Sequence, residues 1–232
     1  MSDGSANGST PLVRCENAGR TYGSGRVATV ALHGATCSVL PGSRVAITGP
    51  SGSGKTTLLH LLAGLDEPTT GVVSWPAIGT RSELRPGPVA MIFQGPSLLP
   101  PLTVLENVAL PLQLLGRRQD EALASARDAL DQFGIGELAD KLPEEISGGQ
   151  AQRAAVARVL AAEPQLILAD EPTGQLDRAS ATRTVDVLVE AAERTGAALV
   201  VSTHDPAVAD RLDERWSIAD GRLGAKEPTR SR

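Results

Sequence analysis

Two glycine-rich stretches in this chain have the composition of phosphate-binding loops. The first, GPSGSGKTT, spans residues 49–57, and the second, ISGGQAQR, spans residues 146–153. Glycine allows a backbone to turn its N–H groups toward an anion, and the N-terminus of a following helix directs a partial positive charge at the same point. The sequence therefore raises the question of why one chain of 232 residues carries two such stretches.

The first stretch matches the pattern G-x-x-x-x-G-K-[ST] and lies between a strand expected at 44–48 and a helix expected at 55–65. A chance glycine-rich turn is the alternative, but the strand, the helix, the lysine and the threonine all argue against it. The residues expected to surround the phosphates are Gly49, Pro50, Ser51, Gly52, Ser53 and Gly54.

Three residues at the start of the following helix have side chains that suit a nucleoside triphosphate. We expect Lys55 to reach the β- and γ-phosphates as a point charge. Thr56 is expected to offer its hydroxyl to Mg²⁺, and Thr57 to bond the α-phosphate.

Polar side chains follow three of the expected strands. The apolar run LILAD ends in Asp170, which suits a Mg²⁺ ligand acting through water, and Glu171 suits a base that polarises the attacking water. His204 follows the run ALVVST and is expected to contact the γ-phosphate and orient that base, and Gln94 is expected to touch Mg²⁺ and the water. The structural alternatives are that Glu171 only caps its strand and that His204 is a packing residue.

The composition limits the possible classes of protein. Hydrophobic residues make up 41% of the chain and charged residues 21%, which allows a substantial core. The net charge of −5 disfavours a general nucleic-acid binder, so we expect no nucleic-acid partner. We find no signal peptide and no apolar run that could span a bilayer. Cys15 and Cys37 do not form a disulfide framework and suit packing in a reducing cytosol.

The order of elements predicts an α/β fold. Continuous apolar strands at 44–48, 165–170 and 198–203, separated by helices, indicate a parallel sheet covered on both faces. The stretches LVRCEN and GATCSVL resemble antiparallel strands near the N-terminus. A mostly helical stretch is inserted at about 95–162 in a domain that spans 11–225, and residues 1–10 and 226–232 are expected to be disordered.

Together these motifs resemble the ATP-binding cassette (ABC) ATPases. The similarity covers Tyr22 to Gly221 and rests on the order of GPSGSGKT, Gln94, SGGQ, LILADE and STHD. It implies ATP as the nucleotide, Mg²⁺ as its cofactor and a P-loop NTPase (RecA-like) core. That core would carry a mostly parallel sheet, an N-terminal antiparallel β-subdomain and an inserted helical subdomain.

The resemblance also explains the second glycine-rich stretch. In this family SGGQ is the signature motif, which holds the γ-phosphate of an ATP bound to a second subunit. Tyr22 lies where the family places an aromatic residue that stacks on adenine, although a half-buried surface tyrosine is the alternative, and Asp177 lies in the loop that links the two sites. The signature residues are Ser147, Gly148, Gly149 and Gln150.

Within the family, the chain looks most like the lipoprotein-release and macrolide-export branch. This similarity implies an ATP-dependent homodimer that drives an integral membrane permease of the FtsX or MacB type from the cytoplasmic face of the cell membrane. Leu98, Leu99 and Leu102 are candidates for contacts with the permease. One departure is the stretch 75–91, which is shorter than the branch normally has.

Three other functions remain as alternatives. A soluble ABC ATPase of the DNA-repair or translation type would usually carry long insertions or two cassettes, and this acidic chain has neither. A regulator that binds ATP without hydrolysing it would not need Glu171 and His204. A small-molecule P-loop kinase would leave SGGQ unexplained.

Overall fold

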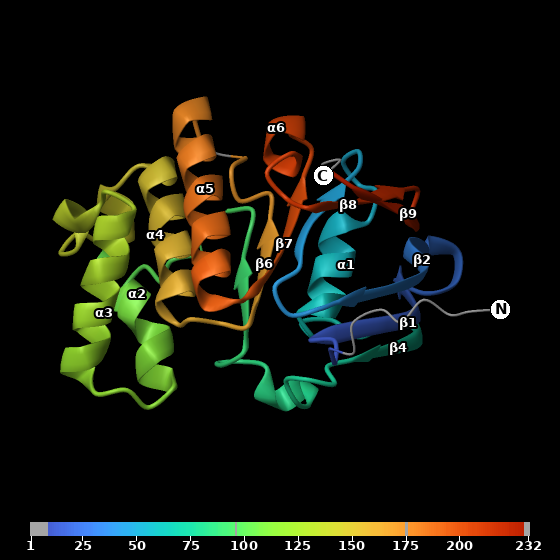
Figure 1. Ribbon diagram of the computed structural model, residues 1–232, viewed down its shortest axis with the longest axis horizontal. Helices are drawn as coiled ribbons and strands as arrows, with labels where there is room; N and C mark the ends of the chain where they lie inside the picture. Colours follow the sequence, from blue (N-terminus) through green and yellow to red (C-terminus); the bar gives the residue numbers. More distant parts are fainter. Residues whose placement is uncertain (1–8, 96, 175, 230–232) are drawn as a thin grey trace.

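A mostly parallel sheet lies in the middle of the molecule. The computed structural model describes residues 9–95, 97–174 and 176–229. A group of helices lies at one end of this sheet and a small antiparallel sheet at the other end (Figure 1). The predicted disordered segment 1–10 lies outside the described residues except for Ser9 and Thr10.

The described chain contains nine strands, six α-helices and four short 3-10 helices. The strands are β1 (Val13–Tyr22), β2 (Thr29–Val39), β3 (Arg44–Thr48), β4 (Thr70–Ser74), β5 (Val89–Ile92), β6 (Leu166–Asp170), β7 (Ala198–Thr203), β8 (Glu214–Ala219) and β9 (Arg222–Pro228). The α-helices are α1 (Lys55–Leu62), α2 (Val104–Leu114), α3 (Gln119–Gln132), α4 (Gly148–Ala161), α5 (Arg178–Thr195) and α6 (Pro206–Ala209), and the 3-10 helices are η1 (Gly25–Val27), η2 (Arg81–Glu83), η3 (Gly136–Leu138) and η4 (Pro143–Glu145).

The central sheet has the strand order β5-β6-β7-β3-β8-β9, and every neighbouring pair is parallel except β8 and β9. Alternate residues of β6 show why its sequence is continuously apolar. Leu166 and Leu168 belong to the core shared with α1 and the antiparallel sheet, whereas Ile167 and Ala169 belong to the core shared with the helical group. Both faces of the sheet are therefore buried, as the predicted parallel sheet requires.

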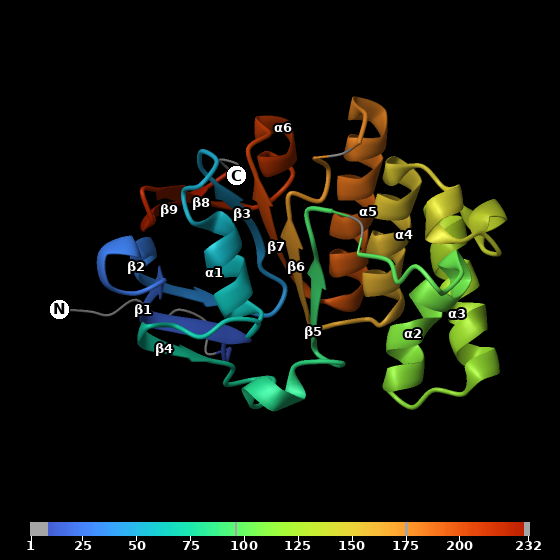
Figure 2. The ribbon, with the colours of Figure 1, turned by 180° about the vertical axis from the view of Figure 1, so that it is seen from behind.

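The antiparallel β-subdomain predicted near the N-terminus is confirmed. Strands β2, β1 and β4 form a separate three-stranded sheet in that order. Cys15 lies opposite Cys37 in the β1–β2 pair, and both are free and buried. Figure 2 shows this sheet beside α1, on the side of the molecule away from α2, α3 and α4.

The prediction of a disordered tail over 226–232 is wrong for residues 226–228. These residues complete β9, because their backbone pairs with β8 in an antiparallel register that sets Lys226 opposite Trp216. The Lys226 ammonium also lies 4.4 Å from the centre of the Trp216 ring, an attractive cation–π geometry. Residues 230–232 lie outside the described residues.

The shortened stretch 75–91 supports the helix that follows the first glycine-rich loop. The last carbonyls of a helix have no partner within the helix and need donors from elsewhere. Here the donors come from three side chains of this stretch. They are Trp75 Nε1 to Leu62 O at 2.8 Å, Arg81 Nε to Gly64 O at 2.8 Å, and Arg85 Nη1 to Ala63 O.

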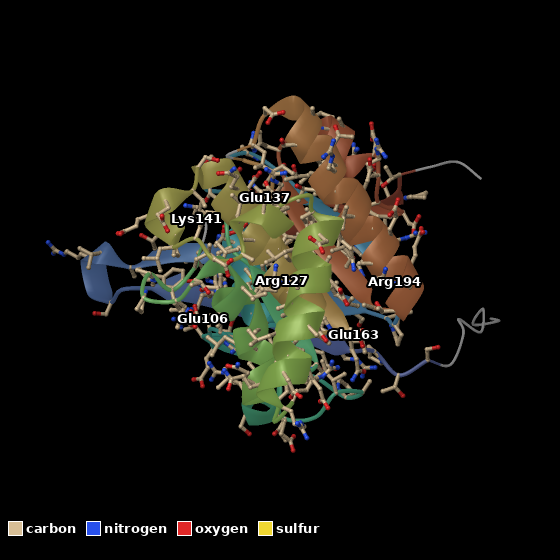
Figure 3. All side chains as sticks on the ribbon, turned by 90° about the vertical axis from the view of Figure 1, so that its left-hand side faces the viewer. Glu106, Arg127, Glu137, Lys141, Glu163 and Arg194 are labelled. Carbon is tan, nitrogen blue, oxygen red and sulfur yellow. The ribbon has the colours of Figure 1, made fainter. Side chains whose placement is uncertain are left out.

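Helices α2, α3 and α4 fall within the stretch 95–162 and pack on one another. No helix of the described chain combines the length and the apolar composition needed to cross a membrane. The end of the molecule that these helices form carries side chains of both charges. Labelled examples in Figure 3 are Glu106, Arg127, Glu137, Lys141, Glu163 and Arg194.

Candidate functional site

The first glycine-rich loop connects β3 to α1 and is packed closely from behind. Gly49 has φ 154°, and a Cβ there would lie 2.1 Å from the carbonyl oxygen of Ile218 in β8. Gly54 has φ 106°, and its Cβ would lie 2.5 Å from another backbone oxygen. The Gly221 amide, in the turn between β8 and β9, donates to Ser53 O at 3.0 Å. The loop can therefore hold this shape only with glycine at these two positions.

Lys55 lies at the first position of α1 and turns its ammonium back into the loop. Nζ donates to the carbonyl oxygens of Gly49 at 2.9 Å and Pro50 at 3.1 Å. It also lies 3.7 Å from Oε1 of Glu171, and the residue is only 7% exposed. The positive charge is thus fixed where the loop and the end of β6 meet.

Asp170 ends β6 beside Thr56. The Thr56 hydroxyl donates to Asp170 Oδ2 at 2.8 Å, and the Ser202 hydroxyl donates to Oδ1. A hydroxyl and a carboxylate are hard oxygen ligands of the kind that Mg²⁺ prefers. The described residues contain no group of three or more His, Cys, Asp or Glu side chains that could hold a metal.

Glu171 has an unusual backbone conformation and two side-chain partners. Its φ is 44°, in the left-handed region that is strained for residues other than glycine. Its amide donates to the backbone and hydroxyl oxygens of Ser202, both at 3.1 Å. Its Oε2 lies 2.9 Å from Nδ1 of His204, while Oε1 faces Lys55. This conformation turns the carboxylate away from Asp170 and toward the glycine-rich loop.

Lys55, Thr56 and Glu171 line one cleft of about 540 Å³, whereas Asp170 lies outside its lining. Two residues that sequence reasoning did not single out, Ala31 and Gly174, complete its lining. The predicted site residues that line it are Ser51, Gly52, Gly54, Lys55, Thr56, Thr57, Gln94, Glu171 and His204.

The signature residues lie outside the lining of this cleft. Ser147 caps the N-terminus of α4, where its hydroxyl accepts from the Gln150 amide at 3.3 Å and its own amide donates to Gln150 Oε1 at 2.8 Å. Ser147 and Gly148 are exposed, whereas Gly149 and Gln150 are half-buried. The start of α4 is therefore a separate, accessible helix N-terminus in this chain.

Asp177 also lies outside the cleft lining and caps a helix. Its carboxylate accepts from the amides of Ala179 and Ser180 at the start of α5, both at 3.0 Å, and from the Ser180 hydroxyl at 2.6 Å. The hydroxyl and amide of Ser180 hold the pKa of Asp177 below its usual value. The preceding residue, Leu176, lies close enough that a Cβ on Gly149 would be 3.4 Å from it.

Tyr22 ends β1 and is 40% exposed. Its hydroxyl donates to Asp66 Oδ2 at 2.9 Å, and Arg20 binds the same carboxylate at 2.8 Å. The Arg20 guanidinium lies 4.7 Å from the centre of the tyrosine ring. These two partners hold the ring in one orientation. Asp66 could not be identified from the sequence, because it lies 44 residues further along the chain.

Ser202, which sequence reasoning missed, is a hydrogen-bond partner of two site residues. It binds both Asp170 and Glu171 and is fully buried. The signal was present: a serine sits near the end of the apolar run ALVVST, and parallel pairing of β6 with β7 sets it beside Asp170. A hydroxyl inside a buried strand needs a buried partner.

Comparisons with known proteins give a consistent result. The family described as ABC transporter matches residues 32–174. The lipoprotein-releasing system ATP-binding protein LolD of Legionella pneumophila (strain Paris) is 40% identical over 215 residues, which cover 90% of this chain and 95% of LolD. The LolD protein of strain Lens gives the same values.

Solved structures of similar fold are also ATP-binding cassettes. The dimeric structure of the cassette MJ0796 in a post-hydrolysis state, bound to ADP and Pi, has a TM-score of 0.88 and 34% identity, covering 95% of this chain and 100% of that one. The structure of cbiO1 from Clostridium perfringens, part of the ABC transporter complex cbiONQ, has a TM-score of 0.80 and 28% identity, covering 94% of this chain and 89% of that one.

Proposed function

Because the chain belongs to the ABC transporter family as an ATP-hydrolysing subunit, we propose that two copies close around two ATP molecules and that this closure drives a membrane permease. Each copy would supply the cleft between the first loop and Glu171 to one ATP. It would supply the start of α4 to the ATP bound by its partner.

The observation that carries this proposal is the separation of the two glycine-rich stretches. The cleft is lined by Lys55 and Glu171 but by no signature residue. Ser147, by contrast, is exposed at a helix N-terminus, which is favourable for an anion. A second copy that brings its Ser147 to the open side of the cleft would complete the site. The relative MJ0796, solved as a dimer bound to ADP and Pi, supports this arrangement.

In the proposed reaction, Glu171 accepts a proton from the water that attacks the γ-phosphate. The water oxygen bonds to the γ-phosphorus as the bond from that phosphorus to the β–γ bridging oxygen breaks, which gives inorganic phosphate and ADP, and Lys55 neutralises negative charge on the phosphate oxygens. His204, 2.9 Å from Glu171, fixes the orientation of the carboxylate and reaches toward the γ-phosphate. Bound Mg²⁺, held by Thr56, Gln94 and through water by Asp170, would supply further positive charge to the phosphates.

A stable complex with a permease requires a docking surface, and we propose an apolar groove of about 400 Å³ for it. The groove lies between the start of β5 and the C-terminal ends of α2 and α4. Leu114 and Leu115 are 63% and 43% exposed there, which is costly unless a partner covers them. The predicted contacts Leu98, Leu99 and Leu102 do not line this groove. The similarity to LolD supports a permease of the lipoprotein-release type.

Replacing Ser147 with arginine tests the shared site. We expect Ser147→Arg to bind ATP as the wild type does, because the residue is outside its own cleft. We expect it to lose hydrolysis by about 100-fold, because it blocks the anion site that it offers to the partner. Fluorescent-nucleotide titration and phosphate release would measure the two effects. Ala124→Arg, on an exposed part of α3, adds the same charge as a control.

Mixing variants sharpens this test. A mixed dimer of Ser147→Arg with a variant defective in the first loop contains one intact site and one doubly defective site. Hydrolysis should therefore return when the two inactive proteins are combined. Wild-type hydrolysis by Ser147→Arg alone would rule out the shared site.

Replacing Leu114 with aspartate tests the docking groove. The charge would lie in an apolar contact, so we expect the share of the protein that sediments with membranes of the source cells to fall by about tenfold. Hydrolysis by the isolated chain should not change, because Leu114 does not line the cleft and the groove shares no lining residue with it. Val72→Asp, on exposed β4, is the control. If Leu114→Asp sediments as the wild type does, the permease docks elsewhere.

A further inference from the structure

One buried side chain of α4 connects the backbone of two segments that carry cleft residues, Gln94 and Glu171. Gln152 is 1% exposed and lies five residues after Ser147, the cap of this helix. Its Nε2 donates to the carbonyl oxygen of Phe93 at 3.3 Å and to that of Pro172 at 3.2 Å. Phe93 immediately precedes Gln94, and Pro172 immediately follows Glu171. The two segments lie at the ends of the neighbouring strands β5 and β6.

A second contact from the same helix holds the other side of the Gln94 loop. Arg158, six residues after Gln152, donates to Ser97 O at 2.8 Å and to the Ser97 hydroxyl at 2.5 Å. Helix α4 therefore binds the chain directly before Gln94 and three residues after it. Movement of α4 and movement of Gln94 are mechanically linked through these contacts.

The choice of glutamine at 152 is not explained by stability. Its Oε1 is buried and has no hydrogen-bond partner among the described residues. An unpaired buried acceptor is unfavourable, and an apolar residue of the same shape would avoid it. An uncharged amide nitrogen with two N–H groups is, however, what two carbonyl oxygens on separate segments require.

We propose that Gln152 is a positioning residue that sets the Glu171 carboxylate and the Gln94 amide relative to the signature end of α4. This inference rests on the proposed roles of Gln94 and Glu171. Gln152 does not itself line the cleft, and its amide donates to the backbone of Phe93 and Pro172. Its loss should therefore lower the rate of hydrolysis and leave ATP affinity nearly unchanged.

The first test is Gln152→Met, which keeps the length of the side chain and removes both donors. We expect kcat to fall by about tenfold or more, and the dissociation constant for ATP to stay within about twofold of the wild-type value. Gln132→Met, at the exposed end of α3, controls for the substitution itself. Val156→Ala, also buried on α4, controls for loss of packing in this helix and should lower thermal stability but not kcat.

The second test is Gln152→Glu, read as a pH profile. An ionised carboxylate has no proton to offer the two carbonyl oxygens, whereas a protonated one can donate to one of them. Burial raises the pKa of such a group. The ratio of variant to wild-type kcat should therefore rise as the pH is lowered from about 8 to about 6. Dividing by the wild-type kcat at each pH removes the pH dependence that the two proteins share.

The inference is overturned if both Gln152 variants keep kcat within about twofold of the wild type at every pH. It is also overturned if Val156→Ala lowers kcat as much as Gln152→Met does. A Glu171→Gln variant, run beside them, separates this inference from the proposed function. If that variant hydrolyses ATP at the wild-type rate, the proposed function fails. If it is inactive and the Gln152 variants are normal, only the role of Gln152 fails.

Discussion

Glu171→Gln should convert this chain into a stable dimer when ATP is present. The amide keeps the shape of the carboxylate and its contact with His204, but it cannot accept a proton from water, so hydrolysis should fall by about 100- to 10,000-fold. It also removes one negative charge beside Lys55, where the γ-phosphate is expected. ATP then persists between two copies, and a ligand that binds only the closed state shifts the population toward it.

Light scattering or sedimentation with Mg²⁺ and ATP would detect the dimer, which should revert to monomer with ADP. We expect the wild type to dimerise only transiently under the same conditions, because it hydrolyses the ATP that holds it closed. Glu121→Gln, at an exposed position of α3, makes the same chemical change away from the cleft and should behave as the wild type. A Glu171→Gln protein that binds ATP at saturation yet stays monomeric would contradict closure by ATP alone.

Lys55→Ala should weaken ATP binding by about 100-fold. Among the described residues, Lys55 is the only lysine or arginine that lines the cleft, so the phosphates would lose the one full positive charge that a side chain supplies there. A hydrogen bond to a charged group contributes up to about 3 kcal/mol, which corresponds to a loss of affinity of about 100-fold. The substitution also removes the two bonds to Gly49 and Pro50 that hold the loop.

Calorimetry with Mg²⁺ and ATP measures this loss directly. Lys141→Ala, at an exposed position whose side chain pairs with Glu145, is the matched control and should bind ATP normally. Tight binding by Lys55→Ala would reject the assignment of the first loop to the phosphates. Loss of binding in both variants would point to a general effect on the fold.

Local sequence patterns predicted the core of this fold well, because each pattern follows from the burial or the turn geometry of its own segment. The strands expected at 44–48 and 198–203 have those bounds in the structure, and the helix expected at 55–65 spans Lys55–Leu62. Continuous apolar runs identify strands buried on both faces, and the glycine pattern identifies the turn between β3 and α1. The predicted residues that line the cleft could be identified because their motifs lie directly after strands of this sheet.

The contacts between distant segments could not be predicted in this way. Gln152 lies in the stretch GGQAQRAA, where a polar residue in a helix is typical of a solvated face, and only the packed fold shows that it is buried. The contact between Asp66 and Tyr22 and the hydrogen bond from Trp75 to the end of α1 also join distant segments and could not be predicted. The error over residues 226–228 has a similar cause, since β9 is a strand only because β8 lies beside it.

The packing of the β8–β9 turn against the phosphate loop has a consequence for synthesis on the ribosome. The loop begins at residue 49, but the Ile218 carbonyl and the Gly221 amide that support it lie about 170 residues further along the chain. Translation proceeds at about 5–20 residues per second, so roughly 8 to 34 seconds separate the appearance of the loop from that of its support. During this interval the nascent chain has the glycine-rich sequence but not the backbone that holds its shape. The nucleotide site is therefore a late product of translation, and a chain that terminates before β8 cannot form it.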